Sequence, residues 1–316
     1  YTLQHLKLVS GQEISIDLDG LVVRSQEAIR YLGVMVDRRL TFGSHVDLAT
    51  TKARGALNAL SAIMRGAGGI SCSRRRLLAS VVTSVLRYAG PAWARALTVQ
   101  SNLVLLNQVH RLTAIRVAGS FSTVSLAAVC VITGMIPVGI LVEEDRECYA
   151  GRGRAGIRAD ARRRTMERWQ REWENDARGR WTHRLIPVIE CWTSRGYGEL
   201  IFHLTQFLTG HGYFREYLHR IGRASSPLCP ACVEVVESPE HVLFHCPRFD
   251  EARARLRGIS REEVRPENIV ALMCGNQEAF DAVSGCVGHV MTRLCLEWRE
   301  FQRHQAVNDH NLVPQG

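Results

Sequence analysis

Residues 1–34 carry the alternation of apolar and polar side chains that is typical of short β-strands. The segments EISIDL (13–18) and LVVRS (21–25) flank Asp19-Gly20, a dipeptide that favours a two-residue hairpin turn. Because successive strand residues point to opposite faces, Asp17 and Asp19 would share the outer face of this hairpin. The sequence therefore predicts a β-hairpin near the start of the chain.

From Ser44 the apolar spacing changes to three or four residues, which is the spacing of α-helices, and the glycines within 66–69 are expected to end this helix. Ser73 is a candidate N-cap for the next helix, and Gly90-Pro91 is expected to end it. The apolar positions of these two helices are Ala53, Ala56, Leu57, Leu60, Ile63, Met64, Leu77, Leu78, Val81, Val82, Val85 and Leu86. Further helices are predicted at about 100–118, 123–132 and 138–150, so the middle of the chain is expected to be an all-helical bundle.

A last helix is predicted at about 277–303, where Phe280, Val287 and Leu294 belong to an apolar face that would point to a core. The polar end, 304–316, is expected to fray. No run of 18 or more apolar residues occurs, so we expect no membrane span and no membrane partner. The chain opens at Tyr1 in strand-like sequence, and we expect it to be part of a longer polypeptide.

The composition is that of a folded chain with an anionic partner. With 316 residues and 46% apolar positions it can form one large or two ordinary domains. The net charge is +9, and Lys7 and Lys52 are the only lysines, so arginine supplies nearly all of the positive charge. Arginine suits bidentate contacts with phosphate, although a GC-rich gene produces the same bias. Both explanations stay open at this point.

The segment 151–184 concentrates this charge. It holds eleven arginines against five acidic residues, interleaved with Trp169, Trp173 and Trp181. One interpretation is a solvated helix whose tryptophans dock on the bundle. The other is a phosphate-facing surface on which tryptophan or arginine stacks on bases. Both can hold, because a helix has two faces.

The strongest local motif is Cys229-x2-Cys232-x8-His241-x4-Cys246. A Cys-x2-Cys turn brings two sulfurs together, and the His and Cys can complete a tetrahedron around zinc. All four positions are filled by protein, so the zinc would be structural and would hold no catalytic water. His245 lies four residues after His241, so a two-Cys, two-His site is also possible; chance packing without a metal is the remaining alternative.

The other seven cysteines are scattered, mostly in apolar stretches, and are best interpreted as small buried residues in a reducing compartment. They are Cys72, Cys130, Cys148, Cys191, Cys274, Cys286 and Cys295.

The chain lacks a recognisable catalytic set. Nucleotidyl transfer needs paired carboxylates that hold two metal ions, whereas Glu143-Glu144-Asp145 and Glu262-Glu263 are interpreted as ordinary surface residues. No lysine follows Lys52 to serve a nuclease, and no hydrolase, nucleotide-binding or metalloprotease motif occurs. The residues alone indicate a nucleic-acid-binding helical segment with a zinc module and no complete active site.

Several blocks, in order, resemble the C-terminal part of the polymerase of type-1 non-LTR retrotransposable elements of insects, the group that inserts into ribosomal RNA genes. The first two are Tyr31-Leu32-Gly33-Val34, followed by Asp37, Leu40, Phe42 and His45, and the stretch Arg74–Trp93. The later ones are Trp169-Gln170, Arg180-Trp181-Thr182, Leu185-Ile186-Pro187, residues 206–218 and the knuckle with HVLFHCPRF (241–249). The resemblance covers nearly all of 1–250.

The resemblance implies a mainly α fold: a short β-hairpin that ends the polymerase palm, a helical thumb bundle, a basic helical region and a small zinc knuckle. The implied regions are 1–43, the end of the reverse transcriptase domain; 44–150, the thumb or connection; and 151–316, a nucleic-acid-binding region with its knuckle at 229–246.

The resemblance also implies an activity for the intact polyprotein, which would be an RNA-directed DNA polymerase with an associated endonuclease, acting in the nucleus on element RNA and target DNA. The catalytic aspartates, with their magnesium, would lie in the upstream part of the same polyprotein, so this segment would hold neither. Its own task would be to grip template–primer and target nucleic acid.

Nine arginines are the candidate phosphate contacts, although three adjacent residues of a helix cannot share one face. They are Arg74, Arg75, Arg76, Arg162, Arg163, Arg164, Arg168, Arg223 and Arg248. Two alternatives stay open: a non-catalytic adaptor whose zinc module binds a protein or a nucleic acid, and the product of a degenerate element.

Overall fold

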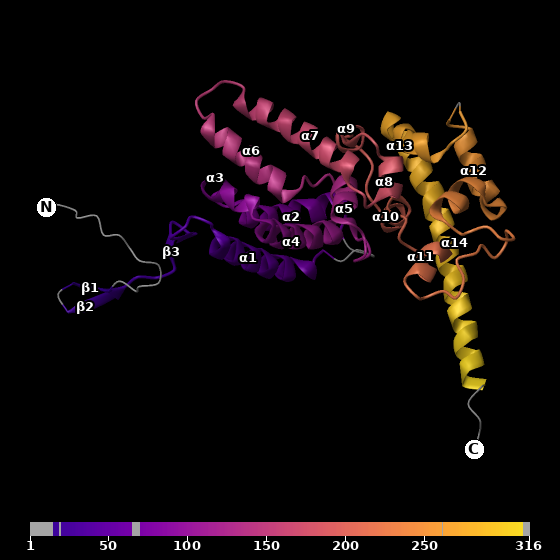
Figure 1. The fold of residues 1–316 in the computed structure, drawn as a ribbon. Helices are drawn as coiled ribbons and strands as arrows, with labels where there is room; N and C mark the ends of the chain where they lie inside the picture. Colours follow the sequence, from indigo (N-terminus) through magenta and orange to yellow (C-terminus); the bar gives the residue numbers. More distant parts are fainter. Residues whose placement is uncertain (1–14, 19, 65–69, 261, 312–316) are drawn as a thin grey trace, which may run out of the picture.

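The computed structural model describes residues 15–18, 20–64, 70–260 and 262–311 (Figure 1). The described part begins with two antiparallel hairpins, formed by β1 (Ser15–Leu18), β2 (Leu21–Arg24), β3 (Ala28–Tyr31) and β4 (Val34–Asp37). The predicted hairpin is confirmed, since β1 pairs with β2 and the carboxylate of Asp17 accepts the N–H of Gly20 at 2.7 Å. Asp19, the other turn residue, lies outside the described residues.

The rest of the described chain is mostly helical. The first group of helices is α1 (Gly43–Ser61), α2 (Cys72–Arg87), α3 (Gly90–Trp93), the 3-10 helix η1 (Ala94–Thr98), α4 (Gln100–Ala118), α5 (Leu126–Thr133), α6 (Val138–Ala150) and α7 (Ile157–Asn175). The second group is α8 (Arg180–Leu185), α9 (Ile189–Thr193), α10 (Phe202–Thr209), α11 (Arg215–Arg220), the π-helix η2 (His241–His245), the 3-10 helix η3 (Pro247–Phe249), α12 (Asp250–Arg257), α13 (Pro266–Gly275) and α14 (Gln277–Asn311).

The predicted helix boundaries are close to those observed, with two corrections around α2. The N-cap is Ser71 and not Ser73, because the hydroxyl of Ser71 accepts the N–H of Arg74 at 3.4 Å. The helix already ends at Arg87, and Gly90-Pro91 instead begins α3, a position at which proline is compatible with a helix. The glycines expected to end the preceding helix lie outside the described residues.

The first core lies among α1, α2, α4 and α6, with β4 against α1. Its fully buried side chains include Val46, Val82, Leu86, Trp93, Leu106, Val109, Val138 and Val142. The predicted apolar face of α2 is wider than the buried one, since Leu77 and Val81 are 72% and 50% exposed. Figure 1 shows this bundle in the middle of the molecule, with the β1–β2 hairpin projecting from it.

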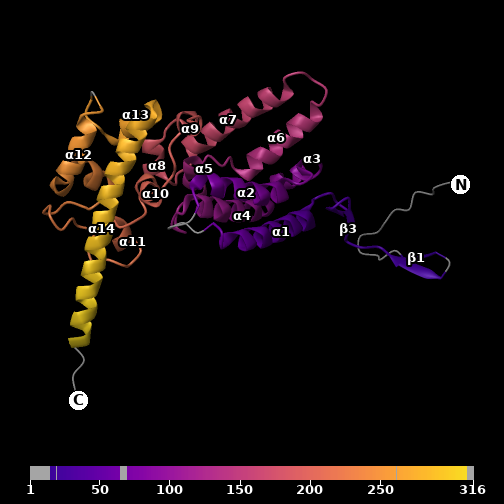
Figure 2. The ribbon, with the colours of Figure 1, turned by 180° about the vertical axis from the view of Figure 1, so that it is seen from behind.

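The second core continues through the C-terminal half and contains residues from both sides of position 150, such as Val129 and Trp173. Its centre is α14, which contacts α10, α12 and α13. Phe280, Val287 and Leu294 of α14 are buried, so the predicted core-facing helix is confirmed. The helix extends to Asn311, past the expected end near 303, and its last turns project beyond the other helices (Figures 1 and 2).

Helix α7 lies along α6 (Figure 1) and docks through its tryptophans. Trp169 and Trp173 are 2% and 1% exposed, and the indole N–H of Trp173 donates to the carbonyl of Ile186 at 2.8 Å. The indole of Trp181 is half-buried and donates to the carbonyl of Phe207 at 2.7 Å. The docking interpretation is therefore confirmed, and stacking of bases on Trp169 or Trp173 is excluded by their burial.

Within the described ranges no single helix is both long and apolar enough to cross a membrane, and α5 and α6 meet that criterion only together, bent by 63°. All ten cysteines are free thiols. Of the scattered seven, Cys72, Cys130 and Cys286 are buried as expected, whereas Cys191 is exposed; Cys148, Cys274 and Cys295 are half-buried.

Candidate metal centre and basic surface

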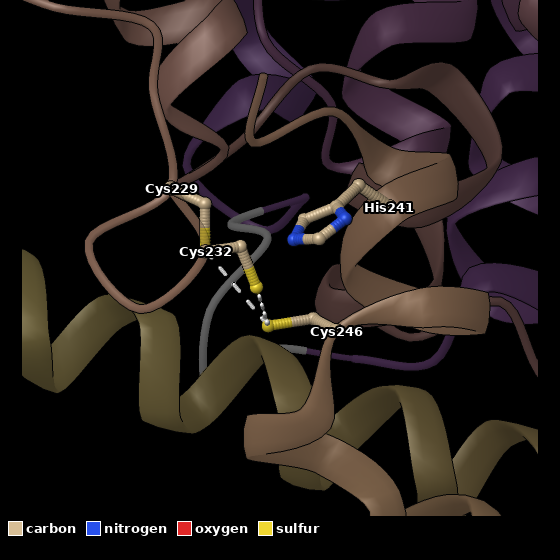
Figure 3. Close-up of side chains that lie close together, drawn as sticks. All are labelled: Cys229, Cys232, His241 and Cys246. Carbon is tan, nitrogen blue, oxygen red and sulfur yellow. Dashed lines mark hydrogen bonds between the residues drawn. The ribbon is translucent and has the colours of Figure 1, made fainter. Parts of the chain in front are cut away.

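The first two cysteines of the motif lie in a short antiparallel turn. The N–H of Cys229 donates to the carbonyl of Val235 at 2.8 Å, and the N–H of Glu237 donates to the carbonyl of Pro227 at 2.9 Å. These bonds hold the chain in a loop from Cys229 to Val235, with Cys232 inside it. Both sulfurs are thereby brought to the same side of the loop (Figure 3).

The other two residues flank the π-helix η2. The N–H of Cys246 donates to the carbonyl of His241 at 2.7 Å, a bond that spans five residues and brings both side chains to the loop. In Figure 3 the imidazole of His241 and the three sulfurs point toward one another, with α14 passing beside them. The four predicted residues thus meet at one point although seventeen positions separate the first from the last.

The geometry suits a tetrahedral metal ion. The four donor atoms all lie within 4.8 Å of one another. The Sγ of Cys246 lies 3.9 Å from that of Cys229 and 4.0 Å from that of Cys232. A tetrahedron with zinc–sulfur bonds of ~2.3 Å has sulfur–sulfur edges of about 3.8 Å. Cys229, Cys232, His241 and Cys246 could therefore hold a metal ion, and their donor set is one that zinc prefers.

The imidazole supports the same conclusion. Nε2 of His241 is buried and has no hydrogen-bond partner, which is costly for a polar atom unless a ligand satisfies it. Burial, and then the charge of Arg248, lowers the pKa of His241, so the ring is held in the neutral form that binds metals. The alternative ligand, His245, is exposed and does not belong to the cluster.

Arg248 lies directly against the sulfurs. Its Nε is 3.4 Å from Sγ of Cys246, and its Nη2 is 3.4 Å from Sγ of Cys229. Burial alone would raise the pKa of the Cys246 thiol, but the hydrogen bonds and positive charge of Arg248 outweigh it and lower that pKa. The guanidinium therefore favours the thiolate form, which is the form that binds metal.

The same guanidinium forms ion pairs with Glu237 and with Glu297 of α14, and the side chain of Arg248 is only 10% exposed. Arg248 was predicted to contact nucleic acid, whereas the observed contacts of its guanidinium lie within the protein. With all of its contacts inside the protein, it compensates the charge of −1 that three thiolates, a neutral imidazole and Zn²⁺ would carry.

The arginines at the start of α2 divide between surface and interior. Arg75 is 4% exposed, and its guanidinium donates to the carbonyls of Val117 and Ile70, each at 2.7 Å. Arg75 was predicted to contact nucleic acid, but its burial leaves little of the guanidinium for a phosphate. Arg74, Arg76 and Arg223 are exposed and stay candidates.

The four candidate arginines of α7 are exposed, and each is paired with an acid. The pairs are Arg162–Glu144, Arg163–Asp160, Arg164–Glu147 and Arg168–Glu172, at 3.1, 3.3, 2.7 and 3.0 Å. The three pairs whose acid is also more than a third exposed contribute at most about 1 kcal/mol, so a phosphate could replace the acid at small cost. The side chain of Glu144, the partner of Arg162, is only 10% exposed. Carboxylates of the protein itself thus partly neutralise the positive charge on the surface of α7.

Carboxylates elsewhere do not form a second metal site. Among the described residues, the Cys/His set is the one group of three or more potential ligands close enough to share a metal. Asp145 pairs with Arg87 at 2.6 Å, and Glu143 with Arg146 at 2.7 Å. Glu144 is buried at 9% exposure, so its interpretation as an ordinary surface residue is wrong.

Comparison with known proteins gives consistent relatives. The chain is 25% identical over 258 residues to the Pol polyprotein of type-1 retrotransposable element R1 of Bradysia coprophila, and 25% identical over 265 residues to that of element R1 4 of Nasonia vitripennis. It is 26% identical over 247 residues to a putative 115 kDa protein in element R1DM of Drosophila melanogaster. The resemblance to type-1 retrotransposable element Pol polyproteins is confirmed.

These matches cover 75%, 78% and 71% of the chain. The chain spans about a quarter of the Bradysia and Drosophila proteins, 26% and 24%, and 67% of the Nasonia one. No protein-family profile matches the chain, and no solved structure does.

Two side-chain contacts were missed by sequence reasoning. Glu237 forms an ion pair with Arg248, and the guanidinium of Arg195 lies 3.4 Å from the ring centroid of Trp192. Neither Glu237 nor Arg195 belongs to a recognisable motif. A Trp-x-x-Arg spacing could have indicated the second contact, because residues three apart on a helical turn are neighbours. For Glu237 the sequence holds no comparable signal.

Proposed function

We propose that this chain is the C-terminal, nucleic-acid-binding part of a retrotransposon RNA-directed DNA polymerase. Residues 1–43 would end the reverse transcriptase domain, 44–150 would be the thumb, and 151–316 would bind template–primer and target with help from a zinc knuckle. Polymerization itself would use magnesium and aspartates in the upstream part of the polyprotein. The element RNA and target DNA would meet this segment in the nucleus.

The observation that carries the proposal is the similarity to retrotransposon Pol polyproteins over about three quarters of the chain. The net charge of +9 supports an anionic partner, and α7 carries exposed arginines on a helix whose tryptophans fix it to the core. The role of the metal would be structural, because four protein ligands leave no position for a reacting water.

The pairing of each α7 candidate arginine with an acid specifically favours a second possibility, a non-catalytic adaptor that binds a protein partner. A compensated surface attracts polyanions less strongly. The two functions differ in their response to salt, because only phosphate binding releases condensed counterions.

The test is to titrate the full chain, loaded with zinc, against fluorescent single-stranded RNA, single-stranded DNA and an RNA–DNA duplex at several salt concentrations. We expect the logarithm of the association constant to fall linearly with the logarithm of the salt concentration. The double variant Arg163→Gln, Arg168→Gln should flatten that slope by about 1 to 2 units. The matched control is Arg38→Gln, Arg39→Gln, two exposed arginines beyond β4.

Absent binding to all three probes, or binding that salt does not weaken, would contradict the proposal and favour the adaptor. If the α7 double variant behaves like its control, α7 is not part of the binding surface. The proposed function would then still be supported by the salt dependence of binding of the wild-type protein.

A further inference from the structure

A polar pocket of about 460 Å³ lies where four segments meet that are far apart in sequence. The start of α2 contributes Ser73 and Arg76, the end of α5 contributes Thr133 and Gly134, and the loop after α9 contributes Arg195 and Glu199; Gln277 at the start of α14 closes one side. None of these residues belongs to the metal cluster or to α7.

Arg195 is fixed in this pocket by stacking. Its guanidinium carbon lies 3.4 Å from the ring centroid of Trp192 and 5.3 Å from that of Phe280. One of its terminal nitrogens donates to the carbonyl of Trp192, but its Nε is buried without a hydrogen-bond partner. A buried charged donor that lacks a partner costs free energy unless a ligand supplies the acceptor.

Arg76 approaches from α2. Among the described residues, its guanidinium forms one hydrogen bond, from Nη1 to the carbonyl of Thr133 at 3.4 Å. The space is open partly because residue 134 is glycine: a Cβ there would lie 3.2 Å from the same nitrogen. Among the described residues neither Arg76 nor Arg195 has a carboxylate within ion-pair distance, in contrast to the arginines of α7.

Glu199 is the one acid in the lining, and it already shows how an anion fits. Its Oε2 accepts the N–H of Ser73 at 3.2 Å, in the first turn of α2. The start of a helix carries partial positive charge and free N–H groups, both of which favour an anionic oxygen. Two arginines against one carboxylate leave the pocket with an uncompensated positive charge.

From these contacts we infer that the pocket binds one phosphate group, held by the guanidinium groups of Arg76 and Arg195 and by the start of α2. Guanidinium forks match phosphate oxygens in a bidentate manner, and a helix start adds N–H donors of the same polarity. Resting on the proposed function, the phosphate would belong to the backbone of a bound polynucleotide, and the contact would be independent of base sequence.

The test compares four variants of the full, zinc-loaded chain in binding single-stranded RNA. Arg76→Gln removes a donor. Ser73→Glu adds a negative charge in the pocket at a helix start, where a carboxylate is compatible with folding. Glu199→Gln removes the competing charge but keeps an acceptor for the N–H of Ser73. The control is Arg54→Gln, an exposed arginine of α1 outside the pocket.

We expect Arg76→Gln and Ser73→Glu to weaken RNA binding about tenfold and to flatten the salt slope by about 0.7 relative to the control, which is the value for one phosphate of a single strand. Glu199→Gln should tighten binding. Melting temperatures measured in parallel show whether a variant has lost its fold and not only a contact with RNA. If the pocket were purely structural, a folded Ser73→Glu variant would bind RNA as tightly as the control.

If wild-type protein binds RNA and all three pocket variants behave like Arg54→Gln, the pocket inference is wrong and the proposed function stands. If wild-type protein binds none of the RNA, DNA and duplex probes, the proposed function fails, and inorganic pyrophosphate becomes the probe for the pocket alone. Pyrophosphate binding that Arg76→Gln and Ser73→Glu abolish would support a phosphate pocket; absence of pyrophosphate binding would overturn it.

Discussion

The guanidinium of Arg248 donates to the sulfur of Cys246 at 3.4 Å and joins the candidate metal site to α14. The same group pairs with Glu237, whose side chain is 3% exposed, and with Glu297 at 2.6 Å. A single side chain therefore connects two ligand cysteines, a buried acid and the longest helix. Contacts of this kind orient metal ligands, and their loss typically lowers metal affinity by about 10- to 100-fold.

Replacing Arg248 by Gln should weaken zinc binding by about 10- to 100-fold, because the thiolates lose their cationic donor. It should also lower the free energy of unfolding by about 3 to 5 kcal/mol, since Glu237 becomes an unpaired buried charge. Zinc affinity is measured by competition with a chelator, and stability by denaturant unfolding. Adding Glu237→Gln to the first substitution should recover part of the stability.

The matched control for that substitution is Arg293→Gln. Arg293 also pairs with Glu297, at 3.0 Å, but its side chain is 47% exposed, so its loss should cost less than about 1 kcal/mol. Equal effects of the two substitutions would show that Arg248 has no special relationship with the cysteines.

Cys246→Ser and His245→Ala should separate the two possible ligand sets. Cys246 is buried in the cluster and His245 is exposed, so only the first substitution should abolish stoichiometric zinc binding. Chelation should likewise expose residues 222–250 to hydrogen exchange. The α1–α4 bundle, which has its own core, should keep its protection. Loss of zinc from His245→Ala would reverse the ligand assignment.

The features that the sequence predicted depend on neighbours along the chain. The Asp19-Gly20 dipeptide predicted the first hairpin from local sequence preference, and β1 does pair with β2; helical spacing located 100–118 and 138–150 closely. The Cys/His cluster was also predictable, because its four residues lie within one short segment. A loop and one irregular turn suffice to bring them together.

Features that depend on distant segments could not be predicted in this way. Arg74, Arg75 and Arg76 are identical as residue types, yet Arg75 is buried because α4 places the carbonyl of Val117 beside it. Arg248 lies two residues after Cys246, and its sequence position does not show that its positive charge is paired within the protein. The pairing becomes visible only when the fold places Glu297 of α14 beside it. The pocket around Arg195 likewise draws on four separate segments.

His110 of α4 should make the stability depend on pH. Its side chain is 1% exposed, and burial lowers its pKa to about 4, against about 6.5 in an unfolded chain. As the pH falls from about 6.5 to about 4, the unfolded chain takes up a proton that the folded one does not. The free energy of unfolding should therefore decrease with falling pH over this range, by up to about 3 kcal/mol from this residue.

Denaturant unfolding of wild type and His110→Leu at pH 7 and pH 5 measures this effect. The decrease from pH 7 to pH 5 should be about 2 kcal/mol smaller in the variant. Some pH dependence should persist in it, because burial lowers the pKa of His211 to about 4 as well. An identical decrease in both proteins would mean that His110 is protonated in the folded state as readily as in the unfolded one.

Two glycines in the loop after α9 offer a test of how closely that loop packs on α14. Gly198 has φ +80°, and a Cβ there would lie 2.6 Å from the ring of Phe280. Gly198→Ala should combine backbone strain with overpacking and lower the free energy of unfolding by about 2 to 5 kcal/mol. Gly196 has open space around it and no positive φ, so Gly196→Ala should be neutral or stabilising by up to about 1 kcal/mol.

Phe280 also contacts Arg195, so Gly198→Ala should weaken phosphate binding in the proposed pocket, and the more so the more it lowers the free energy of unfolding; Gly196→Ala should not. Denaturant unfolding of both variants decides the matter, and equal stabilities would mean that the loop does not lie against Phe280.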